Sequence, residues 1–181
     1  MTTPHNASST GHTSPVRLGI IGCGSVSHAY LAQAATLARE GQVQMVAACD
    51  VKPDRALALR SKFGVRRVAS QPLEVIHAAD VDMVLILTSM PEHGPLTRAA
   101  LEAGKHVLVE KPMAVSLEDA AELVELARQS AGYLLPAPHV ILSPTYQTIW
   151  KRLRRGDVLF HEGDSGDKLY IVLEGKVKLG R

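Results

Sequence analysis

The sequence predicts an α/β fold with a doubly wound parallel sheet, and three stretches carry this prediction. Val16 to Ser27 joins a buried-strand pattern to a glycine loop and then to a helix. A second apolar strand, Val43 to Cys49, ends at Asp50, and Met83 to Leu87 is a continuous apolar run typical of strands covered on both faces. Hydrophobic residues make up 46% of the chain and aromatic residues only 4%, so small aliphatic side chains must build the core.

The glycine loop has the residue order of a dinucleotide-binding unit. Gly22 permits the tight turn out of the strand, Gly24 lets backbone approach a pyrophosphate, and Ser27 fills the third, close-packing position. Asp50 follows at about the twenty-residue offset expected of a ribose ligand. These features predict a Rossmann domain that binds NAD or NADP, with the helix N-terminus facing the phosphates. The expected core face of that helix consists of Val26, Tyr30, Ala34 and Leu37.

Two cations just past Asp50 leave the form of the cofactor open. Lys52 and Arg55 either begin a solvated helix or meet the 2′-phosphate of NADP. The sequence therefore does not separate NAD from NADP.

Further elements are predicted from their start and stop signals. They are a helix from Pro53 to about Lys62 ended by Gly64, a strand from Val65 to Val68, a helix from about Gly94 to Ala103 ended by Gly104, and a helix capped by Ser116 with Ala120, Val124 and Ala127 on its apolar face.

A strand from His106 to Pro112 ends in an acid and a base, Glu110 and Lys111. The carboxyl ends of parallel strands meet at one edge of the sheet, so this pair is expected beside the glycine loop and the loop after Leu87. On their own, these two residues fit a surface ion pair better than a catalytic one.

The chain after this helical region is predicted to be less regular. Tyr133 to Leu135 and Val140 to Leu142 suggest a strand that Pro136 and Pro138 interrupt. A helix opened by Ser143 and Pro144 is expected to follow. Its core face is Tyr146, Ile149, Trp150 and Leu153, and the cations of its last turn, which complement the helix dipole, are Lys151, Arg152, Arg154 and Arg155.

Composition excludes several classes of partner. The net charge of +2 is too small to indicate nucleic acid or an anionic membrane as a partner. No apolar run reaches the length of a membrane span and the N-terminus lacks signal-peptide features, so we expect a cytoplasmic protein. Residues 1–15 are predicted to be a disordered leader. Cys23 and Cys49 lack metal-ligand spacing and are interpreted as a reduced pair on adjacent strands, with no metal site.

These residues together resemble the N-terminal domain of the Gfo/Idh/MocA family, over about Val16 to Asp157. The motifs are Gly-Ile-Ile-Gly-Cys-Gly-Ser at 19–25, Asp50, the run ending at His93, and Ala-Gly-Lys-His-Val-Leu-Val-Glu-Lys-Pro at 103–112. The resemblance implies hydride transfer between NAD or NADP and a hydroxyl-bearing carbon of a sugar, cyclitol or polyol, with Lys111 catalytic. It implies cofactor contacts from Gly22, Gly24, Ser25, Val26, Asp50, Thr88, Pro91, His93, Glu110 and Lys111.

A second resemblance begins where that family's substrate domain is expected. Arg155 to Arg181 resembles the opening strands of a cyclic-nucleotide-binding domain of the catabolite-activator type, with a hairpin around Glu174-Gly175. The residues that bind cyclic nucleotide in that family lie beyond Arg181. We therefore interpret the chain as two joined segments: a Rossmann domain over 16–156 and an incomplete β fragment over 157–181. The fragment's unpaired strands are expected to cause self-association or homo-oligomers.

Three functions follow from this organisation. The first is a sugar or polyol oxidoreductase with little or no turnover as this chain alone, because half of the expected active site comes from the substrate domain. The second is a noncatalytic NAD(P)-binding protein. The third, which the sequence favours least, is a cyclic-nucleotide-responsive regulator.

Overall fold

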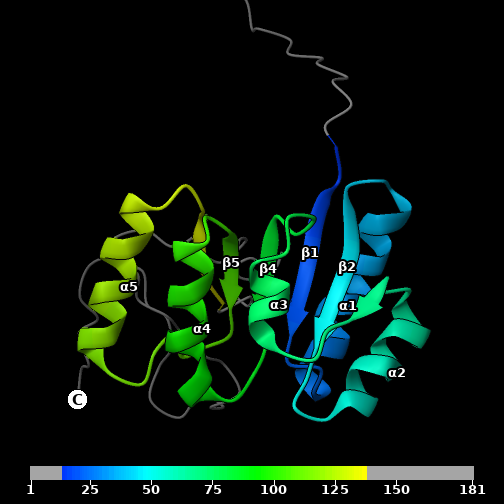
Figure 1. Cartoon of the computed structure of the whole chain (residues 1–181), viewed down its shortest axis with the longest axis horizontal. Coiled ribbons are helices and arrows are strands. Elements are labelled where there is room, and N and C mark those ends of the chain that lie inside the picture. The colour runs from blue at the N-terminus through cyan, green and yellow to red at the C-terminus, as the bar shows by residue number, and fades with distance from the viewer. Residues whose placement is uncertain (1–13, 138–181) are drawn as a thin grey trace, which may run out of the picture. The chain divides into compact units, whose positions relative to one another are not determined.

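The computed structural model describes residues 14–137, which form a sheet of six parallel strands with helices on both faces (Figure 1). The strands are β1 (Val16–Ile21), β2 (Val43–Cys49), β3 (Arg67–Val68), β4 (Met83–Ile86), β5 (His106–Val109) and β6 (Leu134–Pro136). The helices are α1 (Ser25–Arg39), α2 (Pro53–Phe63), α3 (Pro72–Ile76), α4 (Met90–Glu102) and α5 (Leu117–Gln129).

The strand order is β3-β2-β1-β4-β5-β6, and every neighbouring pair is parallel. The chain winds outward from β1 in one direction to β3, then returns to β4 and winds outward in the other direction. This confirms the predicted doubly wound Rossmann fold. The direction of winding reverses between β1 and β4, and open α/β sheets bind their ligands beyond the carboxyl ends of the strands at that switch point.

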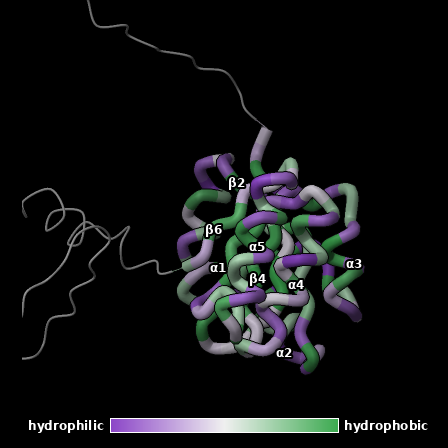
Figure 2. The backbone as a smooth tube through the Cα atoms, turned by 90° about the vertical axis from the view of Figure 1, so that its left-hand side faces the viewer, coloured by the Kyte–Doolittle hydropathy of each residue, from purple (hydrophilic) through white to green (hydrophobic). Residues whose placement is uncertain are grey.

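Two apolar layers hold the helices on the sheet. The face under α3, α4 and α5 buries Val75, Ile86 and Leu101, and the face under α1 and α2 buries Ile20, Leu31 and Leu59. Figure 1 shows α3 and α4 in front of the strands and α1 behind β2. Figure 2 shows hydrophobic segments along the strands and hydrophilic ones on the outer turns of the helices. Aliphatic side chains on both faces explain why the strands have continuous apolar sequences.

The predicted core faces of two helices were right only in part: Ala34 of α1 is buried and Ala127 of α5 packs against the core, as predicted. In α1 the buried residues are Ser27, Leu31 and Ala34, whereas Val26 is 47% exposed. Ser27 is fully buried, and Leu31 and Ala34, four and seven residues later, lie on the same face of the helix. In α5 the buried residue is Leu123, and Val124 is 41% exposed.

The start of α4 also differs from the prediction. The helix begins at Met90, not at Gly94, with Ser89 at its N-cap and Pro91 in its first turn. Proline is tolerated there because the first-turn N–H groups have no partner within the helix. The short helix α3 was not predicted, and β3 is shorter than the expected strand over 65–68.

The last described strand contains a proline that was expected to interrupt it. Pro136 pairs with Val109, and β6 lies at the edge of the described sheet, where a missing backbone N–H is tolerated. The predicted strand over 140–142, the helix from Pro144 and the β fragment over 157–181 lie outside the described residues, as do residues 1–13 of the predicted leader. Within residues 14–137, no helix is long and apolar enough to cross a membrane.

Candidate functional site

The loops after β1, β2 and β4 converge at the switch point. The Leu87 N–H donates to the Ile21 carbonyl at 2.8 Å, and the Gly22 N–H donates to the Cys49 carbonyl at 2.9 Å. Gly22 has a φ of +92°, and a Cβ at this position would lie 2.5 Å from the Leu87 carbonyl oxygen. Glycine is therefore required here both by the left-handed backbone and by the close approach of the neighbouring loop.

Gly24 serves the site in a different way. It is the N-cap of α1 with an ordinary φ of −75°, and a Cβ added there would meet no atom within 4 Å. The space above it is therefore open. Ser25 and Val26 follow as exposed residues of the first turn, which contains no acidic side chain. An exposed helix N-terminus of this kind favours an anion, because its backbone N–H groups and dipole both point outward.

Asp50 is tied directly to the glycine loop. Its Oδ2 accepts a hydrogen bond from the Cys23 N–H at 2.7 Å, and its Oδ1 accepts one from the Lys52 N–H at 2.8 Å. The Arg55 Nη1 lies 3.9 Å from Oδ1, and the Asp50 side chain is only 5% exposed. A carboxylate has about four lone-pair sites, so both oxygens still have acceptor capacity for a ribose hydroxyl.

The two cysteines lie close together, as the sequence predicted. The Cys23 thiol donates to the Cys49 carbonyl at 3.4 Å, and both side chains are buried and free. Burial first, and the nearby Asp50 carboxylate second, raises the pKa of the Cys23 thiol to about 12. It is therefore protonated at neutral pH and is not a nucleophile. Within residues 14–137, no group of three acidic, histidine or cysteine side chains is arranged to hold a metal ion.

The loop after β4 places its predicted residues unequally. Thr88 is half-buried and Pro91 is exposed at the start of α4, whereas His93 is only 1% exposed. The His93 Nδ1 lies 2.7 Å from the Pro112 carbonyl oxygen, and its Nε2 lies 3.0 Å from the Thr88 carbonyl oxygen. Both ring nitrogens therefore face backbone within the protein.

Glu110 and Lys111 follow β5 at the same edge of the sheet. The Glu110 N–H donates to the Ile86 carbonyl at 3.0 Å, which fixes the loop beside β4. Glu110 is 9% exposed, and its Oε2 accepts the Lys111 N–H at 2.9 Å. The side chain of Lys111 is exposed and forms no ion pair with any described residue. The two side chains do not form the surface ion pair that the sequence favoured on its own.

Tyr30 is a residue of this site that sequence reasoning placed only on a packing face. Its hydroxyl, on α1, donates to the Glu110 Oε1 at 2.7 Å across 80 residues of sequence. Burial first, and the Glu110 carboxylate second, raises the pKa of the Tyr30 hydroxyl above its ordinary value, so it remains a donor at neutral pH. No local pattern predicts this contact, because it depends on how α1 packs across the sheet.

The family model that describes an oxidoreductase family with an NAD-binding Rossmann fold, Gfo/Idh/MocA, matches residues 16–136. The chain belongs to this family. The domain therefore has the family's NAD-binding Rossmann fold. A second model, for the cyclic nucleotide-binding domain, matches residues 150–181, which lie outside the described structure.

Relatives in the Gfo/Idh/MocA family match the same region. Inositol 2-dehydrogenase 3 of Saccharopolyspora erythraea is 36% identical over 110 residues, 61% of this chain and 32% of the relative. The 1,5-anhydro-D-fructose reductase of Ensifer adhaerens is 36% identical over 123 residues, 68% of this chain and 36% of the relative. A 3-ketoreductase from Actinomadura kijaniata, solved with NADP, is 29% identical with a TM-score of 0.67, covering 76% of this chain and 41% of that one. The chain spans about a third of the length of these curated relatives.

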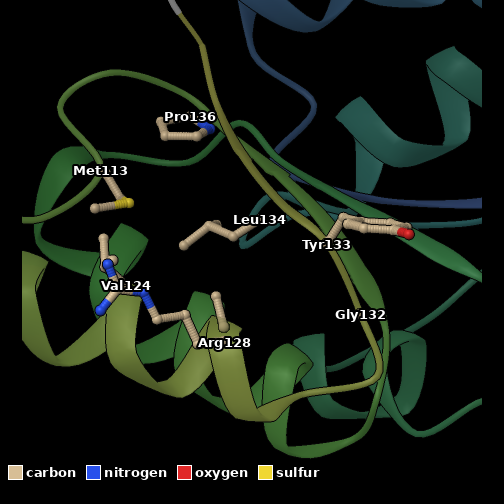
Figure 3. Close-up of a pocket in the computed structure, with 8 residues that line it drawn as sticks. Met113, Val124, Arg128, Gly132, Tyr133, Leu134 and Pro136 are labelled. Atoms are coloured by element: carbon tan, nitrogen blue, oxygen red, sulfur yellow. The ribbon is translucent and has the colours of Figure 1, made fainter.

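An apolar hollow lies away from the switch point, between α5 and β6 (Figure 3). Leu134 points into it toward Met113, Val124 and Arg128, while the Tyr133 ring points away. The hollow contains none of the predicted cofactor-binding residues. The candidate site of this Gfo/Idh/MocA domain is therefore the switch point, where the predicted loops converge.

Proposed function

We propose that this domain holds its cofactor at the switch point and supplies Lys111 to an oxidoreductase acting on a hydroxyl-bearing carbon of a sugar, cyclitol or related polyol. The observation that carries the proposal is the position of Lys111. Its side chain is exposed beside the Glu110 carboxylate, which accepts hydrogen bonds from Tyr30 of α1 and from the Lys111 backbone N–H. Relatives named as inositol dehydrogenases and as an anhydrofructose reductase support this substrate class.

The residues present fit a dinucleotide. The open space above Gly24 and the exposed first turn of α1, Ser25 and Val26, suit the pyrophosphate. Asp50, whose oxygens retain acceptor capacity, suits the ribose 2′-hydroxyl of NAD. Lys52 and Arg55 are exposed beside it and suit the 2′-phosphate of NADP.

Lys111 reaches solvent at the reacting end of the proposed site. The nicotinamide, when bound, accepts or supplies the hydride. In oxidation the Lys111 amine takes the hydroxyl proton as the hydride leaves the carbon, and in reduction the Lys111 ammonium gives that proton back to the oxygen. Thr88, on the loop after β4, and Pro91, in the first turn of α4, complete the nicotinamide side of the site in this proposal.

A second candidate function is cofactor binding without turnover. The observation that favours it is the match of residues 150–181 to the cyclic nucleotide-binding domain, a family other than the oxidoreductase. In this proposal the 181-residue chain alone binds NAD(H) or NADP(H) with little or no turnover, because hydride transfer needs the substrate to be positioned as well as the cofactor.

Calorimetry with NADH, NADPH and cyclic AMP tests these proposals side by side. We expect NADH or NADPH to bind. Binding of cyclic AMP with no binding of either dinucleotide would overturn the proposed function. A panel of sugars and polyols then separates the two candidates. Substrate-dependent reduction of NAD or NADP that is lost in Lys111→Ala would establish catalysis by this chain and refute the noncatalytic proposal.

A further inference from the structure

We propose that Tyr30 and His93 are positioning residues for Lys111: Tyr30 fixes the residue before it, and His93 fixes the residue after it. This inference rests on the proposed role of Lys111 and adds two residues that act through the backbone on either side. Tyr30 comes from α1 and His93 from α4, so Lys111 is held from both helices that begin at the switch point.

The Tyr30 side acts through Glu110. The Tyr30 hydroxyl donates to one carboxylate oxygen at 2.7 Å, and the other oxygen accepts the Lys111 N–H at 2.9 Å. Glu110 is 9% exposed, so these hydrogen bonds to an ionised group are shielded from water. Orienting the carboxylate thereby orients the peptide of Lys111.

The His93 side acts through Pro112. The His93 Nδ1 is 2.7 Å from the Pro112 carbonyl oxygen, and Nε2 is 3.0 Å from that of Thr88. A neutral imidazole donates to one of these carbonyls and an imidazolium donates to both. With 1% of its surface exposed, His93 has no room to contact a cofactor directly, so its contribution is to join the loop after β4 to the loop after β5.

The two anchors link Lys111 to the phosphate end of the site. α1 presents its N-terminus to the proposed pyrophosphate position and, less than two turns later, holds Glu110 through Tyr30. Loss of these hydrogen bonds is expected to make Lys111 more mobile and to weaken binding at the nicotinamide end of the site, while binding at the adenosine end is unchanged.

Amide hydrogen exchange of the full chain tests the proposal without any ligand. Tyr30→Phe keeps the ring but removes the donor, and exchange of the Lys111 amide should rise about ten-fold, as expected for one lost hydrogen bond. The Cys23 amide, which donates to Asp50, should keep its rate. Tyr133→Phe is the matched control, because Tyr133 is 74% exposed and lies directly before β6, at the amino end of the strands and away from Glu110. Equal rates at Lys111 in Tyr30→Phe and the unmodified chain would overturn the Tyr30 anchor.

Two amide variants test His93 without emptying its site. Asparagine places an amide nitrogen at the distance of Nδ1 from the backbone, and glutamine places one at that of Nε2. His93→Asn retains the Pro112 bond and should leave Lys111 exchange within about two-fold, whereas His93→Gln loses it and should raise exchange about ten-fold. The reverse order, or equal rates in both variants, would overturn this anchor.

Ligand affinity distinguishes this inference from the proposed function. In Tyr30→Phe the affinity for NADH should fall about ten-fold. The affinity for ADP-ribose, a ligand without the nicotinamide, should change by less than about two-fold. An equal fall for both ligands would point to a general effect on α1 and overturn the positioning role. If the unmodified chain binds neither ligand, the proposed function fails, while the exchange rates at Lys111 still decide whether Tyr30 and His93 hold that residue.

Discussion

At the amino ends of the strands acidic side chains form ion pairs with guanidinium groups, and Asp82 also accepts the Arg17 backbone N–H at 2.9 Å. At the carboxyl ends the acidic side chains instead accept hydrogen bonds mainly from backbone N–H groups of loops. The amino-end pairs are Arg17 with Asp82 and Arg67 with Asp80, each with a closest contact of 2.6 Å. The carboxylates of Asp50 and Glu110 occupy the other end and hold the Cys23, Lys52 and Lys111 amides.

This difference separates stability from function along one sheet. In each exposed ion pair at the amino edge the two charges offset each other, and the pair contributes little to the free energy of unfolding. Carboxylates at the carboxyl edge fix loops that have no strand partner, and they leave the cations there unpaired, as with Lys111, or weakly paired, as with Arg55 at 3.9 Å. Substitutions at the two edges are therefore expected to change different measured quantities.

The largest expected effect is that of Gly22→Ala at the carboxyl edge. The new Cβ would lie 2.5 Å from the Leu87 carbonyl oxygen, on a backbone with a φ of +92°. We expect a loss of about 3 kcal/mol or more in the free energy of unfolding, measured by urea denaturation. Gly41→Ala is the matched control, because it shares a positive φ but has open space around the Cβ, so its cost should be smaller.

Gly24→Val should separate binding from folding at the same loop. Its φ of −75° suits any residue and the space around its Cβ is open, so the loss in stability should stay near 1 kcal/mol. The branched side chain would occupy the proposed pyrophosphate position, and NADH affinity should fall on the order of 100-fold. Unchanged affinity by calorimetry would refute the placement of the pyrophosphate at this loop.

Asp50→Ala is expected to affect both stability and binding. Two backbone N–H groups lose a charged acceptor, which should cost about 1–3 kcal/mol of stability. NAD affinity should fall about ten-fold and more than NADP affinity, because only NAD offers a free 2′-hydroxyl to the carboxylate. Asp50→Asn keeps one acceptor oxygen and should recover part of the stability. Equal losses for both cofactors would place the ribose contact elsewhere.

The sequence predicted the fold and the loops of the site because their signals are local. Glycines at fixed offsets, an acid after a strand and apolar runs of strand length depend on neighbouring residues in the chain, and the predicted β2 has the observed bounds. The core face of α1 was predicted correctly at Ala34 but not at its first turn, because the buried residue there, Ser27, is polar and gives no apolar signal. Val26 fits an apolar stripe by spacing but lies at the exposed first turn.

The site's internal contacts lay beyond local signals. His93 belongs to a motif, but its burial and its two carbonyl partners follow from the packing of α4 against the loop after β5. The bond between Tyr30 and Glu110 spans three neighbouring strands of the sheet, from the helix after β1 to the end of β5. Such contacts require the strand order, which no short stretch of sequence specifies.

Asp82→Asn tests the amino edge and has the smallest expected effect. The Arg17 guanidinium, chiefly through its hydrogen bonds, lowers the pKa of the Asp82 carboxyl from its ordinary 3.8 to about 2. A lowered pKa means that the ionised form is stabilised by folding, so its contribution is complete above pH 3.8 and is lost as the pH falls toward 2. Asp82 and Arg17 are each more than a third exposed, so the contribution should not exceed about 1 kcal/mol. Urea denaturation at pH 6 should therefore show a small loss in Asp82→Asn, and the difference from the unmodified chain should disappear near pH 2. NADH affinity at neutral pH should stay the same, and a fall as large as that of Asp50→Ala would contradict the separation of the two edges.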